Sequence, residues 1–314
     1  MNASGAIIIL NWNGADETLA CLRSLAAQDL SDWQVIVVDN GSADDSVARV
    51  RSAFPAATLL ATGQNLGYAG GNNVGIHHAL GQGAAHLCIL NNDVVLAAGA
   101  LQAMLDVLVR HPDAGVVTPL VAQQGKPPLV WALGSRMEWR TGSVSRVAAG
   151  ERIEAWQGRD EFAVEIASGA AMLVRRAVFE QIGLFDEAFF LYYEETDWCL
   201  RAQMAGHAIY AAPSAVAWHH VSAALGADSP VVDYYMLRNH LRLIDRHATG
   251  SGRARLWTRI VLRNLATIGA YTLKPPRVAR RAHRNARLCA LRDAFAGRWG
   301  KMGDDVEQCC QGVR

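Results

Sequence analysis

The feature that most constrains the fold is a cycle of strand, polar turn and helix that recurs through roughly the first hundred residues. The first cycle opens with the apolar run Ala6–Leu10, and the second with Gln34–Val38. Short continuous apolar runs are typical of strands buried on both faces. About four such cycles predict an α/β fold with a mostly parallel central sheet flanked by helices.

The segments between the expected strands have their own patterns. Leu19, Leu22 and Leu25 recur at helical spacing after the first strand. Ser42 and Asp44 form a cluster of N-cap residues that predicts the start of a helix running through Val50. The third cycle is expected to consist of a strand, a glycine-rich turn and a helix, and a fourth strand ends in Asn91-Asn92-Asp93.

Polar clusters follow each of these expected strands. Ligands of parallel α/β sheets bind beyond the carboxyl ends of the strands, so the clusters are expected to converge on one rim of the sheet. The clusters are Asn11 to Asn13, Asp39-Asn40, Asn65 to Asn72 and Asn91 to Asp93.

A second organised block begins near residue 166, after a less regular stretch in which residues 131–147 are compatible with a hairpin. The block predicts a strand at Ala170–Val174, a short helix at Arg176–Ile182 and a helix from about Thr196 to Ala205. Strands then run to His219-His220. Gly206 is expected to end the preceding helix as a C-cap.

Two groups of side chains could carry chemistry. Asp93 and His219 each follow a strand and suit a hard divalent ion with mixed oxygen and nitrogen ligands. The alternative for Asp93 is a turn that hydrogen-bonds its own backbone. Glu194, Glu195 and Asp197 cluster at a helix start beside aromatic residues, which raises carboxyl pKa values and suits a general base. The alternative is favourable charge at the helix N-terminus.

Several common classes are disfavoured by missing motifs. The glycine-rich segments lack G-x-G-x-x-G, which argues against a dinucleotide-dependent oxidoreductase. Neither a P-loop nor a G-x-S-x-G elbow occurs in the sequence. The six cysteines show no C-x-x-C spacing, so reduced, incidental thiols are expected. No apolar window is long enough for an ordinary membrane span, and the N-terminus does not resemble a signal peptide, so a cytoplasmic location is expected.

The net charge of +1 hides an asymmetry. Residues 253–301 hold 13 Lys or Arg and one acid, whereas residues 1–252 carry a net charge of −9. The basic segment predicts an amphipathic helix with Arg255, Arg259 and Arg263 away from its apolar face. That face is expected to hold Leu256, Trp257, Ile260, Val261, Leu265 and Ile268. Such a helix binds an anionic membrane surface or packs against the acidic body. No motif supports nucleic-acid binding.

Six segments follow one another along residues 5 to 245. They read IIILNWNGADETLACLRSL, IVVDNGSADDS, NLGYAGGNNVGI, ILNNDVVL, GLFDEAFFLYYEETDWCLRAQMAGH and AVAWHH. In this order and spacing they resemble the motif series of glycosyltransferase family 2, most closely its bacterial rhamnosyltransferase-like branch. The six motifs together are specific although each alone is not.

This resemblance implies the GT-A fold and a nucleotide-sugar site. Residues 1–115 would form the nucleotide-sugar-binding half, residues 116–250 the acceptor-binding and catalytic half, and residues 251–314 a basic, largely helical extension. Asp39 would contact the nucleoside. The other residues implied to line the nucleotide-sugar site are Asn11, Asn13, Asn65, Gly67, Asn91, Asn92 and Asp93.

The resemblance also implies a mechanism. Asp93 stands at the metal-ligand position of the family's D-x-D motif, with His219 as a second ligand to Mg²⁺ or Mn²⁺. Glu195 takes the place of the general base, usually Asp, and Glu194 or Asp197 could share the role. The implied activity is inverting transfer of a sugar from a nucleoside diphosphate to a glycan or lipid-linked acceptor in cell-surface polysaccharide synthesis.

Several implied details stay open at the level of sequence. dTDP-rhamnose is the first expectation for the donor, by resemblance to the branch, with UDP- and GDP-sugars as alternatives. A peripheral position on the inner face of the plasma membrane would suit a lipid-linked acceptor. The alternative function is a catalytically inactive nucleotide-sugar-binding protein of the same fold.

Overall fold

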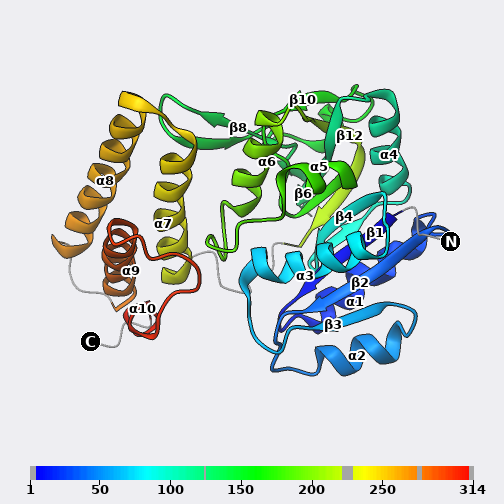
Figure 1. The fold of residues 1–314 in the computed structure, drawn as a ribbon, viewed down its shortest axis with the longest axis horizontal. Coiled ribbons are helices and arrows are strands. Elements are labelled where there is room, and N and C mark those ends of the chain that lie inside the picture. The colour runs from blue at the N-terminus through cyan, green and yellow to red at the C-terminus, as the bar shows by residue number, and fades with distance from the viewer. Residues whose placement is uncertain (1–4, 124, 221–228, 274–277, 311–314) are drawn as a thin grey trace. The chain divides into compact units, whose positions relative to one another are not determined.

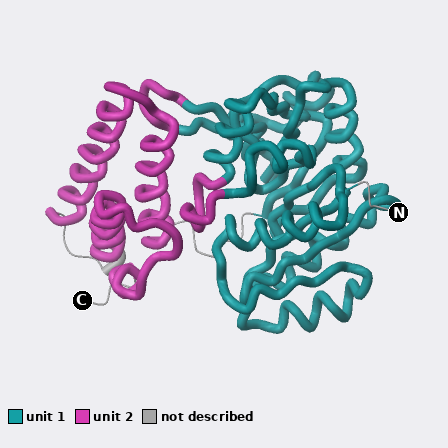
Figure 2. The backbone as a smooth tube through the Cα atoms, viewed as in Figure 1, with its two compact units in different colours: residues 1–137, 144–185, 195–222 teal, residues 138–143, 186–194, 223–314 magenta. Residues whose placement is uncertain are grey.

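The computed structural model describes residues 5–123, 125–220, 229–273 and 278–310. Residues 274–277 and 311–314 of the expected basic extension lie outside this set. The chain forms two compact units, coloured separately in Figure 2. The sheet unit comprises residues 1–137, 144–185 and 195–222, and the helical unit comprises residues 138–143, 186–194 and 223–314. The functional division expected at residues 115 and 250 stays a prediction.

The sheet unit is built on one ten-stranded mixed sheet, drawn in Figure 1. Its main order is β10-β12-β6-β11-β4-β1-β2-β3, with β5 paired to β12 and β7 paired to β6. The strands are β1 (Gly5–Asn11), β2 (Trp33–Asp39), β3 (Thr58–Ala61), β4 (His86–Asn91), β5 (Val94–Leu96), β6 (Ala114–Gln123), β7 (Leu129–Ala132), β10 (Phe162–Val164), β11 (Ala171–Arg175) and β12 (Ala208–His219).

The four strands expected from the recurring cycle are parallel neighbours. β1 lies between β2 and β4, and the register pairs Asn11 with Asp39 and Leu10 with Asn91. The polar residues that end these three strands therefore stand at one edge of the sheet, as the sequence predicts. β11 runs antiparallel between β4 and β6, so the sheet is mixed rather than wholly parallel.

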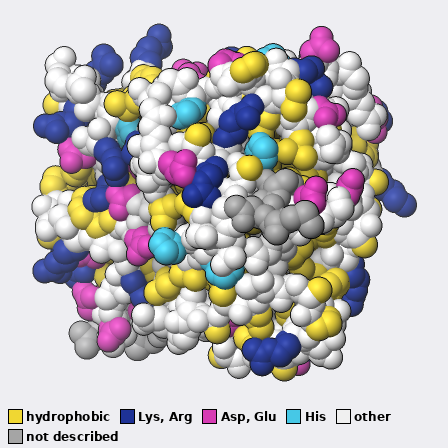
Figure 3. Space-filling view, turned by 45° about the vertical axis from the view of Figure 1, so that its right-hand side comes forward, with side chains coloured by type: hydrophobic (Ala, Val, Ile, Leu, Met, Phe, Trp, Pro, Cys, Tyr) yellow, Lys and Arg dark blue, Asp and Glu magenta, His cyan; other side chains and the backbone are white. Residues whose placement is uncertain are grey.

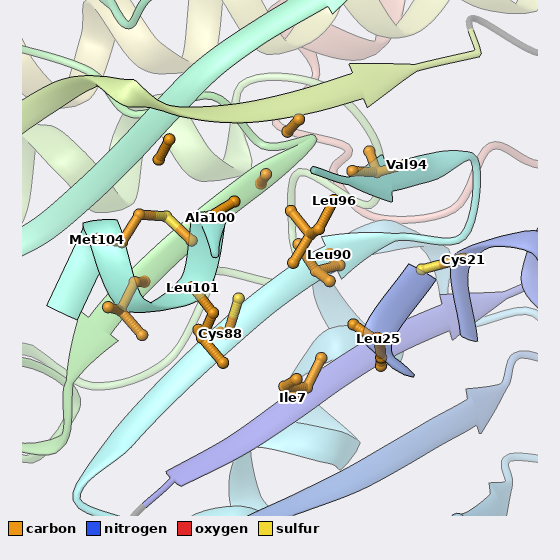
Figure 4. Close-up of a cluster of buried hydrophobic side chains, with 14 of the residues drawn as sticks. Ile7, Cys21, Leu25, Cys88, Leu90, Val94, Leu96, Ala100, Leu101 and Met104 are labelled. Carbon is orange, nitrogen blue, oxygen red and sulfur yellow. The ribbon is translucent and has the colours of Figure 1, made fainter. Parts of the chain in front are cut away.

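Helices of the sheet unit pack on the sheet because their apolar faces are buried there. One core lies where α1 and α4 contact it, and it contains Ile7, Cys88, Leu90 and Met104, shown in Figure 4. All four side chains are fully buried. The helices are α1 (Ala15–Ser24), α2 (Ser46–Ala53), α3 (Gly67–Gly81), α4 (Ala100–Arg110), α5 (Arg176–Ile182) and α6 (Glu194–Met204), with short 3-10 helices at Leu25–Ala27 and Ile153–Ala155.

The glycine-rich segment expected as a turn is helical instead. α3 begins at Gly67, and Gly71 and Gly75 pack directly on the strands, Gly71 on β1 and Gly75 on β1 and β2. A Cβ at Gly71 would collide with Leu10, and one at Gly75 would collide with Ile8. The glycines therefore permit close helix–sheet packing, and only Gly67, with φ +74°, needs the left-handed region.

The hairpin expected within residues 131–147 is present. Strands β8 (Ser135–Glu138) and β9 (Ser143–Arg146) form a two-stranded sheet. α5 has the bounds that the sequence predicts, and α6 begins two residues earlier than expected, at Glu194. Gly206, with φ +93°, follows the end of α6 as expected.

The helical unit contains four helices after residue 229, among the residues that the structure describes. They are α7 (Pro230–His247), α8 (Gly250–Leu273), α9 (Val278–Phe295) and α10 (Asp304–Cys310). α8 buries one stripe, at Leu256, Ile260, Asn264 and Ile268, which confirms an amphipathic helix. Leu265 was expected on the same face but is 45% exposed, because one residue beyond Asn264 turns the helix by about 100°. Figure 3 shows one face of the molecule, on which basic and acidic side chains are interspersed.

Candidate functional site

Asn11 and Asp39 tie the ends of β1 and β2 together. The Asn11 side-chain amide donates to Asp39 Oδ1 at 2.9 Å, and the Thr18 hydroxyl donates to Asn11 Oδ1 at 2.7 Å. The Ser42 backbone N–H donates to the second Asp39 oxygen at 3.2 Å. Both side chains are buried, with 1% and 4% exposure. The carboxylate of Asp39 is thus fixed in orientation at the tip of β2.

Asn13 and Ser42 link the loops that follow these two strands. Asn13 has φ +50°, and its Oδ1 accepts a hydrogen bond from the Ala43 N–H at 2.7 Å. The Asn13 N–H donates to the Ser42 hydroxyl oxygen at 2.9 Å. The expectation that Ser42 belongs to an N-cap cluster is wrong, because α2 starts only at Ser46 and Ser42 binds the neighbouring loop instead.

Asn40, Asn65 and Gly67 form a third link, at the start of α3. The Asn40 amide donates to Asn65 Oδ1 at 3.2 Å and to the Gly67 carbonyl at 3.0 Å. In return, Asn65 Oδ1 accepts from the Gly67 N–H at 2.8 Å. Asn40 carries this network and was not singled out from the sequence, although its place in a polar cluster after a strand was a usable signal.

Asn91, Asn92 and Asp93 connect β4 to β5, and each of the three side chains has a different environment. The Asn92 amide donates to the Thr18 hydroxyl oxygen at 3.2 Å, so it is used in holding α1. Asn91 donates its backbone N–H to the Ala170 carbonyl at 2.9 Å. Among the residues that the structure describes, buried Asn91 Oδ1 has no hydrogen-bond donor, which leaves an acceptor beside Asp93 for a ligand.

Asp93 and His219 meet because β5 pairs antiparallel with the end of β12. His219 is in register with Val94, and the His220 N–H donates to the Asp93 carbonyl at 2.9 Å. His219 Nε2 lies 3.1 Å from Asp93 Oδ1, and the two side chains are 11% and 10% exposed. The two residues that the sequence pairs across 126 positions are therefore in direct contact.

This pair fits a small divalent cation. Adjacent ligands of an octahedral ion with bonds of about 2.0–2.1 Å lie roughly 3 Å apart, which is close to the observed O–N separation. Within the described part of the chain, no group of three or more His, Cys, Asp or Glu side chains could hold a metal. An ion here would have two protein ligands and open positions for phosphate oxygens or water, as Mg²⁺ and Mn²⁺ sites on nucleotides do.

Trp131 and Arg146 extend this region and were missed from the sequence. The Trp131 ring meets His219 edge-on at 6.1 Å between centroids, and the Arg146 guanidinium lies 3.9 Å above the Trp131 ring. Trp131 lies on β7 of the large sheet, and Arg146 ends β9 of the two-stranded sheet. The only sequence signal was that both lie in the expected hairpin, and their proximity to His219 depends on the tertiary fold.

The three acids at the start of α6 have different surroundings. Asp197 is fully buried, and its Oδ2 accepts a hydrogen bond from Arg201 Nε at 2.9 Å. Arg201 also donates to the carbonyls of Ile182 at 2.6 Å and Leu184 at 2.8 Å. Asp197 therefore orients an arginine that joins α6 to the segment after α5. Glu194 is 4% exposed.

Glu195 is half-buried beside a glycine that gives it room. A Cβ at Gly169 would lie 3.3 Å from Glu195 Cγ and 3.6 Å from the Tyr68 hydroxyl oxygen. The Tyr68 hydroxyl donates to the Gly169 carbonyl at 2.5 Å, and the Thr196 hydroxyl donates to Glu195 Oε1 at 3.3 Å. Burial raises the pKa of Glu195 above its ordinary value. A carboxylate with this property suits proton transfer near neutral pH.

None of the helices in the described ranges is both long enough and apolar enough to span a membrane.

Comparisons with known proteins agree with this geometry. The family described as "Glycosyl transferase family 2" matches residues 6–183. An N-acetylglucosaminyl-diphospho-decaprenol L-rhamnosyltransferase of Mycobacterium tuberculosis is 31% identical over 266 residues, which cover 76% of this chain and 83% of that protein. The dTDP-rhamnosyl transferase RfbF of Shigella flexneri is 23% identical over 259 residues, which cover 79% of this chain and 82% of that protein.

Solved structures show the fold. The mannosyltransferase PcManGT from Pyrobaculum calidifontis, in complex with GDP-Man and Mn²⁺, has a TM-score of 0.55 at 16% identity, covering 99% of this chain and 84% of that one. S. aureus TarS 1–349 in complex with UDP-GlcNAc has a TM-score of 0.58 at 14% identity, covering 94% and 81%. The chain has the GT-A fold, as expected.

Proposed function

The chain belongs to glycosyltransferase family 2 and is a glycosyltransferase, and from this premise we propose that it transfers a sugar from a nucleoside diphosphate donor to a lipid-linked saccharide. The relatives named above support L-rhamnose from dTDP-rhamnose as the first choice of donor sugar. The observation that carries the proposal is the 3.1 Å contact between Asp93 and His219 at the tips of two strands distant in sequence.

Asp93 and His219 would hold a divalent cation, in line with the Mn²⁺ present in complexes of structural neighbours. When bound, such an ion supplies positive charge that offsets the negative charge developing on the leaving diphosphate. The unsatisfied Asn91 Oδ1 lies next to Asp93 in the chain and would accept a hydrogen bond from the donor or from water.

The nucleoside would lie over the tips of β1 and β2. Asp39 is held by Asn11 and Ser42, and each carboxylate oxygen retains a second lone pair for a donor group on the base or ribose. Asn13, Asn65 and Gly67 would shape the same pocket, because their side chains and backbone join the surrounding loops. These residues recognise the donor and take no part in proton transfer.

Glu195 would act as the general base. Its carboxylate removes the proton from the acceptor hydroxyl as that oxygen attacks the anomeric carbon from the face opposite the diphosphate. The bond to the diphosphate oxygen breaks, the new glycosidic bond forms, and the configuration at the anomeric carbon inverts. The raised pKa of Glu195 makes it a better proton acceptor than an ordinary glutamate. Glu194 would support it, whereas Asp197 is committed to Arg201.

The outer face of α8 would contact the inner, anionic face of the plasma membrane, where a lipid-linked acceptor resides. α8 contains no Asp or Glu, and Arg255, Arg259 and Leu262 line an open depression of about 580 Å³ on its exposed side. Leu262 and Leu273 are 60% and 89% exposed. Arginines beside exposed leucines fit an interface between phosphate headgroups and acyl chains.

A direct assay tests the proposal. Purified protein with Mn²⁺ is incubated with dTDP-rhamnose, UDP-GlcNAc or GDP-mannose and an N-acetylglucosaminyl-diphospho-prenol acceptor, and products are read by mass spectrometry. We expect rhamnosyl product of inverted configuration. Raised melting temperature with one nucleotide-sugar but no product with any acceptor would instead support an inactive nucleotide-sugar-binding protein.

A further inference from the structure

The loop that leads into α6 has an uncommon backbone conformation. Phe190, Tyr192 and Tyr193 have φ values of +62°, +68° and +72°. Side chains with a Cβ adopt this left-handed region at a cost, and three such residues within four positions persist only when the surroundings impose the conformation. The loop belongs to the helical unit, and its last residue is bonded to Glu194, the first residue of α6.

One side chain holds this loop. Asn239, on α7 and fully buried, donates its amide hydrogens to the carbonyls of Phe189 at 2.7 Å, Leu191 at 2.7 Å and Tyr192 at 3.0 Å. The left-handed turns point these carbonyls at a common centre, and a donor at that centre stabilises them there.

The orientation of the Asn239 amide is itself fixed. Arg238 Nε donates to Asn239 Oδ1 at 3.0 Å, so the NH₂ group must face the loop. On either side along α7, Tyr235 stacks on Phe190 at 5.3 Å between ring centroids, and His240 stacks on Tyr193 at 5.4 Å. Hydrogen bonds to the backbone and ring stacking therefore act on the same short loop.

We propose that Asn239 is a positioning residue for sugar transfer. It holds residues 189–193 in the conformation, left-handed at Phe190, Tyr192 and Tyr193, that delivers Glu194 and Glu195 at the first turn of α6. This inference rests on the proposed role of Glu195 as the base. Asn239 touches neither donor nor acceptor; it acts through the direction in which the chain enters α6. A change in that direction moves the carboxylate away from the acceptor hydroxyl.

The test variant is Asn239→Asp, which keeps the size of the side chain and removes both N–H donors. Asn264→Asp is the matched control, because Asn264 is also buried in the helical unit but donates to the Ile260 carbonyl of its own helix. We expect Asn239→Asp to lower kcat on the order of 10²-fold with an unchanged KM for the donor, since small misplacements of a catalytic group have effects of this size. The control should keep kcat within a few-fold.

A double-mutant cycle with Glu195→Gln separates positioning from general damage. If Asn239 acts through Glu195, its substitution has little further effect once the base is gone. Wild-type kcat in Asn239→Asp, or an equal loss in both backgrounds, would overturn the positioning role. Full activity in Glu195→Gln alone would instead remove the base assignment. If Asn239→Asp does not fold, Asn239→Ser replaces it in the same double-mutant cycle. The serine hydroxyl keeps one hydrogen-bond donor.

Discussion

The strand ends of the sheet unit and the loop before α6 both hold candidate site residues in place, but they do so through different contacts. At the strand tips, Asn11 and Asp39 stand opposite each other in a parallel register and bond directly. Before α6, carbonyls of a left-handed loop are held by Asn239, which lies 48 residues from Leu191 in the chain. The geometry at the strand ends thus follows from regular pairing, whereas the proposed base follows a strained segment that one distant side chain holds.

Substitutions at Asp93 should have the largest effect. Asp93→Ala is expected to lower kcat/KM by about 10³-fold or more, because loss of an ion that stabilises a diphosphate leaving group removes several kcal/mol. Chelation of divalent ions should abolish transfer, and Mn²⁺ should restore it. Steady-state rates with saturating acceptor measure both effects.

Asp106→Asn, an exposed aspartate on α4, is the control for Asp93. It should keep wild-type activity and wild-type dependence on Mn²⁺. Full activity of Asp93→Ala, or of the wild-type enzyme in excess chelator, would contradict the proposed metal-binding role of Asp93.

Glu195→Gln should come next, with kcat lower by about 10²–10⁴-fold and donor binding unchanged. Since burial raises the pKa of Glu195, the wild-type rate should fall as pH drops through a value above the ordinary glutamate range of about 4.3. Below that value the carboxyl is protonated and accepts no proton; above it the rate levels off. Glu180→Gln, on the exposed side of α5, should leave the profile unchanged.

A substitution of Asp197 can be compared with one of Glu195 on the same helix, α6. At Asp197 the expected loss is in the stability of the fold rather than in catalysis. Asp197→Ala leaves Arg201, which is 17% exposed, without its carboxylate, and loss of one partner of a buried ion pair costs about 3–5 kcal/mol. Urea denaturation should show this loss of stability, while the folded fraction keeps kcat within a few-fold. A stable variant without activity would place Asp197 in the chemistry.

The smallest effect per residue is expected on the outer face of α8. Arg255→Ala and Arg259→Ala should each weaken binding to vesicles containing anionic phospholipid by about 1 kcal/mol, and binding should fall as salt rises. Flotation assays measure this. Arg23→Ala, on α1, is a control of equal charge change. Equal vesicle binding by all three variants would exclude α8 as the membrane-facing surface.

The parts foreseen from the sequence are those controlled by local pattern. The strands before Asn11, Asp39 and Asn91, the bounds of α5 and the meeting of Asp93 with His219 follow from apolar runs, residue spacing and family motifs. The register of the parallel strands then places their polar ends together. The positions of these residues could therefore be predicted without knowing any tertiary contact.

The parts that were missed depend on tertiary contacts. No local signal shows that Ser42 binds Asn13, that Gly169 leaves space for Glu195, or that Asn239 holds a loop about 50 residues earlier in the chain. The glycines of α3 were expected in a turn because glycine disfavours helices, yet close packing on β1 outweighs that preference.

The most direct test of the central claim is Mn²⁺ binding followed by electron paramagnetic resonance, with dTDP as the nucleotide and UDP as a second probe. The account predicts that the wild-type protein binds Mn²⁺ together with a nucleoside diphosphate, and that Asp93→Ala and His219→Ala lose this binding while remaining folded. Wild-type Mn²⁺ binding in both variants would contradict it.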